Sequence, residues 1–332
     1  MRMRTTELRR RAVMLFIMVG LPIACTLSRE SGVDTTRVAL SGSANANATA
    51  TATATADASA DDWRPPVVAE LPDDSLGRAI RRGLALFVHT QDSLPRFVGA
   101  NLACSSCHLD EGRRATAAPV TGVFARYPRY LERTGAVVSI EERVNYCMTR
   151  SLAGWRLPSE SREMQDMVAY LAFMSRGVPV GVPGKPTGMP QMPAIHGDTT
   201  RGAQVYRASC ERCHGADGAG IANAPALWGA KSFSVGASMT REERAASFVR
   251  HNMPFDQPGT LTDKQAFDVA AYFIAKPRPD LPGKENDWPG GGAPADVPYV
   301  TKGHRAYRPP PRLLPRRDPA RAIVGAPRPV SR

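Results

Sequence analysis

Two copies of one short motif constrain this chain of 332 residues more than any other feature of its sequence. The copies are Cys104-Ser-Ser-Cys107-His108 and Cys210-Glu-Arg-Cys213-His214. This spacing is the attachment signature of c-type heme: two thiols bond to the heme vinyl groups, and the adjoining histidine is the proximal iron ligand. A thioredoxin-like redox pair and half of a zinc site are the competing interpretations. Two complete motifs in one chain favour heme over both, so we predict two covalently bound hemes c.

The residues around the two motifs repeat as well. Ahead of each motif a glycine lies four residues before an aromatic residue, namely Gly83 and Phe87 in the first copy and Gly202 and Tyr206 in the second. Such a glycine lets the first helix of a cytochrome c pack closely against the last helix. Apolar residues at helical spacing follow each motif and predict that last helix. We therefore predict a mainly α fold with two tandem class I cytochrome c domains, residues 67–177 and 195–283, joined by a Pro/Gly-rich linker at 178–194.

The N-terminal residues predict export. Residues 1–24 place five arginines ahead of a short apolar run, which is typical of a secretory signal peptide, with a signal anchor as the alternative. The segment Leu21-Pro-Ile-Ala-Cys25 resembles a bacterial lipoprotein box, so Cys25 is a candidate lipid anchor. Residues 25–66 are rich in Ala and Thr and would form a disordered tether. We expect a periplasmic protein, either free or held to the membrane by a lipid.

The net charge of +12 resides at the two ends of the chain. Residues 1–12 carry a charge of +4, residues 301–332 carry +8, and the remainder sums to zero. A neutral central part gives no reason to expect a nucleic-acid partner. Residues 284–332 read as a basic, Pro-rich and extended tail, which either contacts anionic lipid or an acidic partner, or merely adds solubility.

The repeat also indicates a second axial ligand for each iron. Met253, followed by proline, lies 39 residues after His214, and a Met-Pro pair is the usual distal arrangement in a cytochrome c. The same distance from His108 leads to Cys147. We therefore favour Cys147 as a thiolate ligand of the first iron.

Three alternatives remain for Cys147. It could be a small buried apolar residue, it could pair with Cys25 in a disulfide, or its neighbour Met148 could be the ligand. With a thiolate ligand the first heme would favour ferric iron, whereas a His/Met pair raises the potential of the second. Electrons should then pass from the first heme to the second.

Several segments resemble the diheme thiosulfate dehydrogenases. They are Leu102–Leu109, Tyr127–Arg133, Glu142–Ser151, Pro225–Gly229 and Ala246–Pro254, and the resemblance spans about residues 70 to 280. It implies an enzyme that joins two thiosulfates into tetrathionate at a His/Cys-ligated heme, in a reaction that can be reversible. The released electrons would pass through a His/Met-ligated heme to a periplasmic acceptor. We expect that acceptor to be a small cytochrome c or a high-potential iron–sulfur protein.

The resemblance also implies which residues bind the substrate. Arg133 and Arg150 match the substrate-binding arginines of the family, and Ser151 matches its serine in the substrate pocket; surface salt bridges are the alternative for the arginines. The resemblance would further allow Cys147 to leave the iron and bond to the sulfane sulfur of thiosulfate. Met239 stands where some members have a lysine that replaces the distal methionine, so it would either exchange with that methionine or simply pack.

Two other functions remain open at this stage. A diheme electron carrier without a substrate of its own would explain both motifs, but neither Cys147 at the ligand spacing nor the arginines around it. An enzyme that transfers sulfur to a carrier protein would also use a His/Cys heme. Access of a free dianion to the Cys147 site would distinguish the two enzymes.

Overall fold

The computed structural model describes residues 64–178, 188–221, 224–306 and 308–318, all within one compact unit. The predicted signal peptide, Cys25 and nearly all of the tether lie outside these residues, as do positions 179–187 of the linker and the end of the tail. In the described ranges, no helix is long and apolar enough to span a bilayer. The export signal and the lipid anchor therefore stay predictions.

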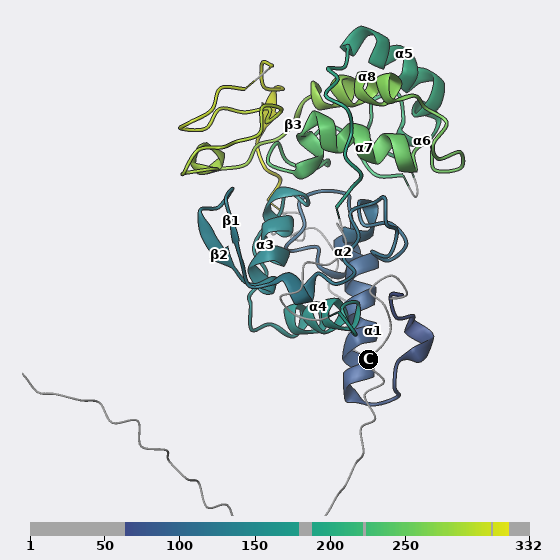
Figure 1. Cartoon of the computed structure of the whole chain (residues 1–332), viewed down its shortest axis with the longest axis vertical. Helices are drawn as coiled ribbons and strands as arrows, with labels where there is room; N and C mark the ends of the chain where they lie inside the picture. Colours follow the sequence, from purple (N-terminus) through teal and green to yellow (C-terminus); the bar gives the residue numbers. More distant parts are fainter. Residues whose placement is uncertain (1–63, 179–187, 222–223, 307, 319–332) are drawn as a thin grey trace, which may run out of the picture. The chain divides into compact units, whose positions relative to one another are not determined.

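The first half of the described chain holds four helices and one hairpin (Figure 1). The helices are α1 (Ser75–Val88), α2 (Thr90–Ser93), α3 (Ile140–Arg150) and α4 (Arg162–Phe173), and the antiparallel strands are β1 (Arg129–Leu131) and β2 (Ala136–Val138). Single 3-10 turns are η1 (Val68–Glu70), η2 (Cys104–Ser106) and η3 (Phe124–Arg126). The first motif begins in η2, and Cys147 lies on α3.

The second half repeats the pattern. Its helices are α5 (Thr199–Ser209), α6 (Glu211–His214), α7 (Glu242–Asn252) and α8 (Asp263–Ile274), with 3-10 turns η4 (Ser238–Thr240) and η5 (Lys284–Asn286). Two short strands, β3 (Arg278–Pro279) and β4 (Leu313–Leu314), pair in parallel. The N-cap side chain accepts a hydrogen bond from the first turn in each of the longer helices except α7, and these N-cap residues are Asp74, Ser139, Ser161, Asp198 and Thr262.

The predicted close helix crossing occurs in both halves. A Cβ atom on Gly83 would lie 2.0 Å from the carbonyl oxygen of Asp166 on α4, and one on Gly202 would lie 1.9 Å from that of Asp268 on α8. Only glycine permits so close an approach of two backbones. The residue before each glycine is an arginine that binds the same aspartate, with Nε to Oδ2 distances of 2.7 and 2.8 Å. The α1/α4 crossing and the α5/α8 crossing therefore share both the glycine contact and the arginine–aspartate pair.

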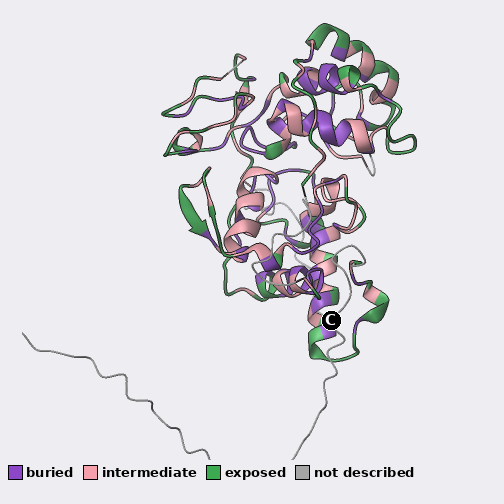
Figure 2. Ribbon diagram, viewed as in Figure 1, coloured by how far each residue is buried: buried purple, intermediate pink, exposed green. Residues whose placement is uncertain are grey.

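Buried side chains form three clusters (Figure 2). The largest contains residues from both halves, including Leu102 and Met148 from the first and Phe233 and Phe267 from the second. A second cluster fills the space between α1 and α4. The halves therefore share part of their core.

The third cluster differs from our expectation of an extended tail. Trp288, Val297 and Tyr299, all from the segment after residue 283, are buried together with Val235 and Leu281. Burial of their apolar surface favours packing of this segment. The high Pro and Arg content of the sequence had instead suggested an extended chain. Strand β4 also binds the segment back to β3. Residues 284–306 and 308–318, named the C-terminal segment below, thus pack against the cytochrome halves.

Candidate active site

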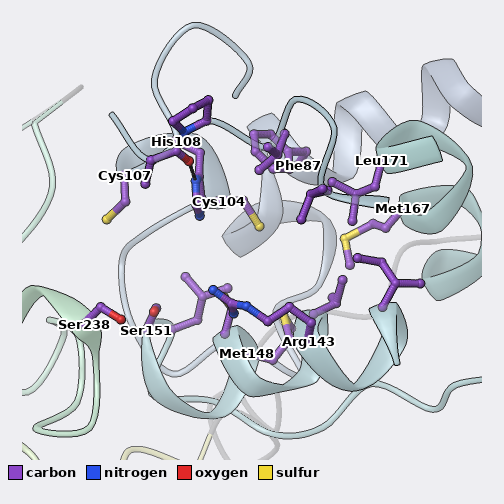
Figure 3. A pocket seen from close by; sticks show the side chains of 18 of the residues that line it. Phe87, Cys104, Cys107, His108, Arg143, Met148, Ser151, Met167, Leu171 and Ser238 are labelled. Atoms are coloured by element: carbon purple, nitrogen blue, oxygen red, sulfur yellow. Dashed lines mark hydrogen bonds between the residues drawn. The ribbon is translucent and has the colours of Figure 1, made fainter. Parts of the chain in front are cut away.

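A cavity of about 480 Å³ lies between the first motif and helix α3 (Figure 3). Cys104, Cys107 and His108 line one side of it, and residues of α3 line the other. Its volume is within the range of natural ligand and cofactor sites. Apolar side chains make up much of the remaining wall, including Phe87, Leu102, Val120 and Leu171.

Each motif histidine is oriented by a backbone carbonyl. His108 Nδ1 lies 2.5 Å from the carbonyl oxygen of Ala118, and His214 Nδ1 lies 2.9 Å from that of Pro225. A carbonyl can only accept a hydrogen bond, so Nδ1 carries the proton and donates it. The Nε2 lone pair of each ring is therefore available to a metal ion.

The three thiols of this cavity differ in acidity. Burial raises the pKa of Cys104 to about 11 and that of Cys107 to about 12. Burial alone would also raise the pKa of Cys147, but the positive charge of Arg143 and a contact with His108 outweigh it and lower this pKa to about 6. Arg143, one helical turn before Cys147, donates from Nη1 to Sγ at 2.7 Å. Cys147 is thus held as a thiolate.

These residues fit a c-type heme. The two neutral thiols and His108 lie on one side of an apolar cavity, and the Cys147 thiolate lies in the wall formed by α3. A histidine and a thiolate would be suitable ligands for heme iron. Ligation of the iron by Cys147 stays a prediction. Met148 also lines the cavity but is 1% exposed and belongs to the core.

The residues expected to ligate the second heme both lie in the second half of the fold. His214 is buried, and Met253 lies directly after α7, where it packs against the largest core cluster. Met239 packs against the same cluster, so its alternatives stay open. Asn252, next to Met253, receives a hydrogen bond from Thr116 Oγ1 (2.8 Å) and donates one to the Thr116 carbonyl (3.0 Å).

The structure does not bring all the predicted substrate residues to the cavity. Cys147 and Ser151 line it, whereas Arg133 and Arg150 are not part of its lining. Both arginines instead bind Asp287, with Arg133 Nε at 3.0 Å and Arg150 at 2.8 and 2.5 Å.

Sequence reasoning missed the arginines that do line the cavity. They are Arg126, Arg129, Arg143, Arg241 and Arg244. Arg143 could have been found from its position four residues before Cys147, on the same face of a helix. The others come from separate parts of the chain, and no spacing rule connects them to the motif.

Family models match both halves of the chain. A model described as SoxA/TsdA, cytochrome c domain, matches residues 97–180, and one described as cytochrome c oxidase, cbb3-type, subunit III, matches residues 197–273. The prediction of two cytochrome c domains in a mainly helical fold is confirmed. Such domains bind heme c covalently.

Curated relatives identify the family. A thiosulfate dehydrogenase of Psychrobacter arcticus is 42% identical over 239 residues, which is 70% of this chain and 73% of the relative. The chain belongs to the thiosulfate dehydrogenase family. A second member, from Allochromatium vinosum, is 40% identical and covers 64% of this chain and 83% of its own length. The predicted resemblance and the assignment as an oxidoreductase of this family are confirmed.

A solved structure of the family has a similar fold. The thiosulfate dehydrogenase TsdBA of Marichromatium purpuratum aligns with a TM-score of 0.62 and 34% identity. The alignment covers 67% of this chain and 50% of that chain. The likeness therefore extends over about two thirds of this thiosulfate dehydrogenase family member, but over only half of the solved chain.

Proposed function

We propose that this protein oxidises two thiosulfate ions to tetrathionate in the cavity between His108 and Cys147. We further propose two hemes c: His108 and Cys147 would ligate the iron of the first, and His214 and Met253 would ligate that of the second. The observation that carries this proposal is Cys147, a thiolate held by Arg143 opposite a heme-type histidine. Electron transfer alone does not require a cysteine thiolate at this position.

The reaction balances without a proton or a leaving group other than a thiolate. The Cys147 thiolate and the sulfane sulfur of one thiosulfate form a sulfur–sulfur bond and release two electrons. A second thiosulfate then attacks that sulfane sulfur, tetrathionate forms, and the Cys147 thiolate departs. When bound, the hemes supply one-electron acceptors for the two electrons.

The charges of the cavity suit dianions. Arg241 and Arg244 are already paired with carboxylates of Asp296 and Glu243. Arg143 bonds to the Cys147 thiolate, and Arg126 has no carboxylate within salt-bridge distance among the described residues. We assign the binding of the thiosulfate oxyanions to Arg143 and Arg126, with Ser151 as an additional hydrogen-bond donor.

Arg133 and Arg150 act less directly in this proposal. Because both bind the buried Asp287, they contribute to the architecture beside α3 and not to the first contacts with substrate. Cys147 and Ser151 remain our candidates for direct contact.

Electron exit and cellular location are also proposals. The export signal read from residues 1–24 supports a periplasmic protein, and a small cytochrome c or a high-potential iron–sulfur protein would accept electrons from the second heme. A lipid at Cys25 would keep the enzyme near membrane-bound acceptors.

The test uses the oxidised, heme-loaded protein under anaerobic conditions. Thiosulfate should reduce the visible heme bands of the wild type but not those of Cys147→Ala, and tetrathionate should be the product. The control is ascorbate, which should reduce the second heme in both proteins. If the wild-type bands stay ferric with thiosulfate while ascorbate works, the protein is an electron carrier or acts on another sulfur compound.

A further inference from the structure

A buried carboxylate of the C-terminal segment lies beside helix α3. The Asp287 side chain is 5% exposed, and both guanidinium groups that it binds, those of Arg133 and Arg150, are 12% exposed. Its Oδ2 also accepts a hydrogen bond from the Tyr299 hydroxyl at 2.5 Å. One carboxylate thus pairs with two arginines and accepts a hydrogen bond from a phenol. Burial alone would raise the pKa of Asp287, but these contacts hold it below its usual range.

Contacts around Asp287 join three parts of the chain. The backbone N–H of Trp288 donates to the Arg133 carbonyl at 2.9 Å, and the Trp288 ring centroid lies 4.7 Å from the Arg133 guanidinium carbon. Arg133 Nη2 also donates to the Gly236 carbonyl at 2.8 Å. Ser234 Oγ donates to the Arg150 carbonyl at 2.7 Å. The hairpin, the end of α3 and the loop at 234–236 therefore meet at this carboxylate.

The same cluster continues to the catalytic cysteine. The Tyr146 ring lies 4.4 Å from the Arg150 guanidinium carbon and 5.3 Å from that of Arg143, and Arg143 bonds to Cys147. The backbone N–H of Ser151 donates to the Cys147 carbonyl at 2.8 Å, so Cys147 and Arg150 belong to the same last turn of α3. A displacement of Arg150 would therefore reach Cys147 within one helical turn.

We propose that Asp287 is a positioning residue for the Cys147 site, one that fixes the last turn of α3 and keeps two arginines out of the substrate cavity. Without its charge, two guanidinium groups would be buried with no counter-ion, which is strongly unfavourable. They would move toward solvent or toward the anion-binding cavity, and α3 would follow. This inference rests on the proposed ligation by Cys147, and it gives the C-terminal segment a role in catalysis.

The experiment compares the heme-loaded variants Asp287→Asn and Asp280→Asn. Asp280 is the matched control because it also follows α8 and pairs with a lysine, Lys284 at 2.6 Å, but no contact joins it to α3 in the described chain. The measurements are the thiolate-ligation signature of the first heme by absorption and electron paramagnetic resonance, the potential of each heme, and steady-state kinetics.

In Asp287→Asn the thiolate signature should weaken, and the potential of the first heme should shift in the positive direction while that of the second stays unchanged. Both the lost negative charge and the weaker thiolate bond act in this direction. Activity should fall by about 10- to 100-fold, as expected for residues that orient a metal ligand. Asp280→Asn should match the wild type.

A purely structural role would lower the melting temperature of Asp287→Asn but leave the first-heme spectrum and potential of the folded protein unchanged, and that result would overturn the proposal. If Asp287→Asn does not fold, Tyr299→Phe removes the hydrogen bonds that the hydroxyl makes with Asp287 and with Arg133 and keeps the carboxylate. It should give a smaller shift in the same direction, and a wild-type spectrum and potential in this variant would also overturn the proposal. Absence of a thiolate signature from the wild type would instead reject ligation by Cys147.

Discussion

The glycine at each helix crossing offers a direct test of the repeated fold. In Gly202→Ala, a new Cβ would lie 1.9 Å from the Asp268 carbonyl oxygen and 2.8 Å from the Tyr272 Cβ. Because the nearest atom belongs to the backbone of α8, no side-chain rotation relieves the clash. Helices α5 and α8 must therefore move apart by about 1.5 Å to restore an ordinary contact. The second cytochrome domain should therefore lose its closest packing.

Two opposing effects set the size of this change. Alanine favours a helix over glycine by about 1 kcal/mol, whereas overpacking costs about 1–3 kcal/mol, with the upper end expected against rigid backbone. The net destabilisation is then about 2 kcal/mol, which corresponds to a melting temperature lowered by about 4–8 °C for a chain of this size.

The assay is thermal unfolding of the heme-loaded protein, followed by far-UV circular dichroism and by heme absorption. Gly290→Ala is the control, because a Cβ there meets no atom within 4 Å and the residue has no left-handed backbone. If Gly202→Ala melts at or above the wild-type temperature, helix propensity outweighs the clash and the close crossing is not what stabilises the domain.

Three further predictions concern the site, the contact between the halves, and pH. Arg143→Gln should lower kcat/KM for thiosulfate by about 100- to 1000-fold, the typical loss for a charge-stabilising donor, while the exposed control Arg96→Gln keeps wild-type kinetics; equal kinetics in both variants would exclude Arg143 from catalysis. Thr116→Val leaves the buried Asn252 Oδ1 without its partner and should cost about 1–3 kcal/mol in chemical denaturation, so an unchanged midpoint would contradict the contact. The pKa of Asp268 is lowered because its bonds to Arg201 and to the Asp198 N–H outweigh its burial, so its stabilisation is fully present above the ordinary aspartate pKa of about 3.9 and is lost as the pH falls through the lower folded-state pKa. Wild type should therefore exceed Asp268→Asn in stability at neutral pH and approach it in acid, and a difference that grows in acid would refute this sign.

Local spacing was sufficient to predict much of this molecule. The two motifs and the glycine four residues before an aromatic residue depend on neighbours within one domain, whereas the ligand role read from the 39-residue distance to Cys147 stays a prediction. The packed C-terminal segment could not be read in this way. Its few large apolar residues, such as Trp288 and Tyr299, are spaced without helical or strand periodicity among prolines and arginines. Only tertiary packing reveals that they form a cluster.

The arginines show why a correct family resemblance can still leave roles open. Arg150 and its partner Asp287 are 137 residues apart, and Arg133 and Asp287 are 154 apart, so no sequence pattern pairs them. The motif match identified two arginines near Cys147 but could not tell which side of α3 they face. The carboxylate in the C-terminal segment decides that question for this chain.

The distribution of carboxylates therefore shapes the anion site as much as the arginines do. Asp110 and Glu111, which follow the first motif, both lie within salt-bridge distance of Arg113. The positive charge of Arg113 therefore reduces the repulsion that these two carboxylates would exert on an anion in the cavity. Asp287 offsets part of the charge of Arg133 and Arg150, whose guanidinium carbons lie 5.6 and 4.4 Å from the centroid of the Tyr146 ring. What remains among the described lining residues is the charge of Arg143 next to the thiolate and of Arg126 and Arg129 at the wall. A cavity with few uncompensated cations attracts a dianion yet can release tetrathionate, which carries the same charge spread over a larger ion.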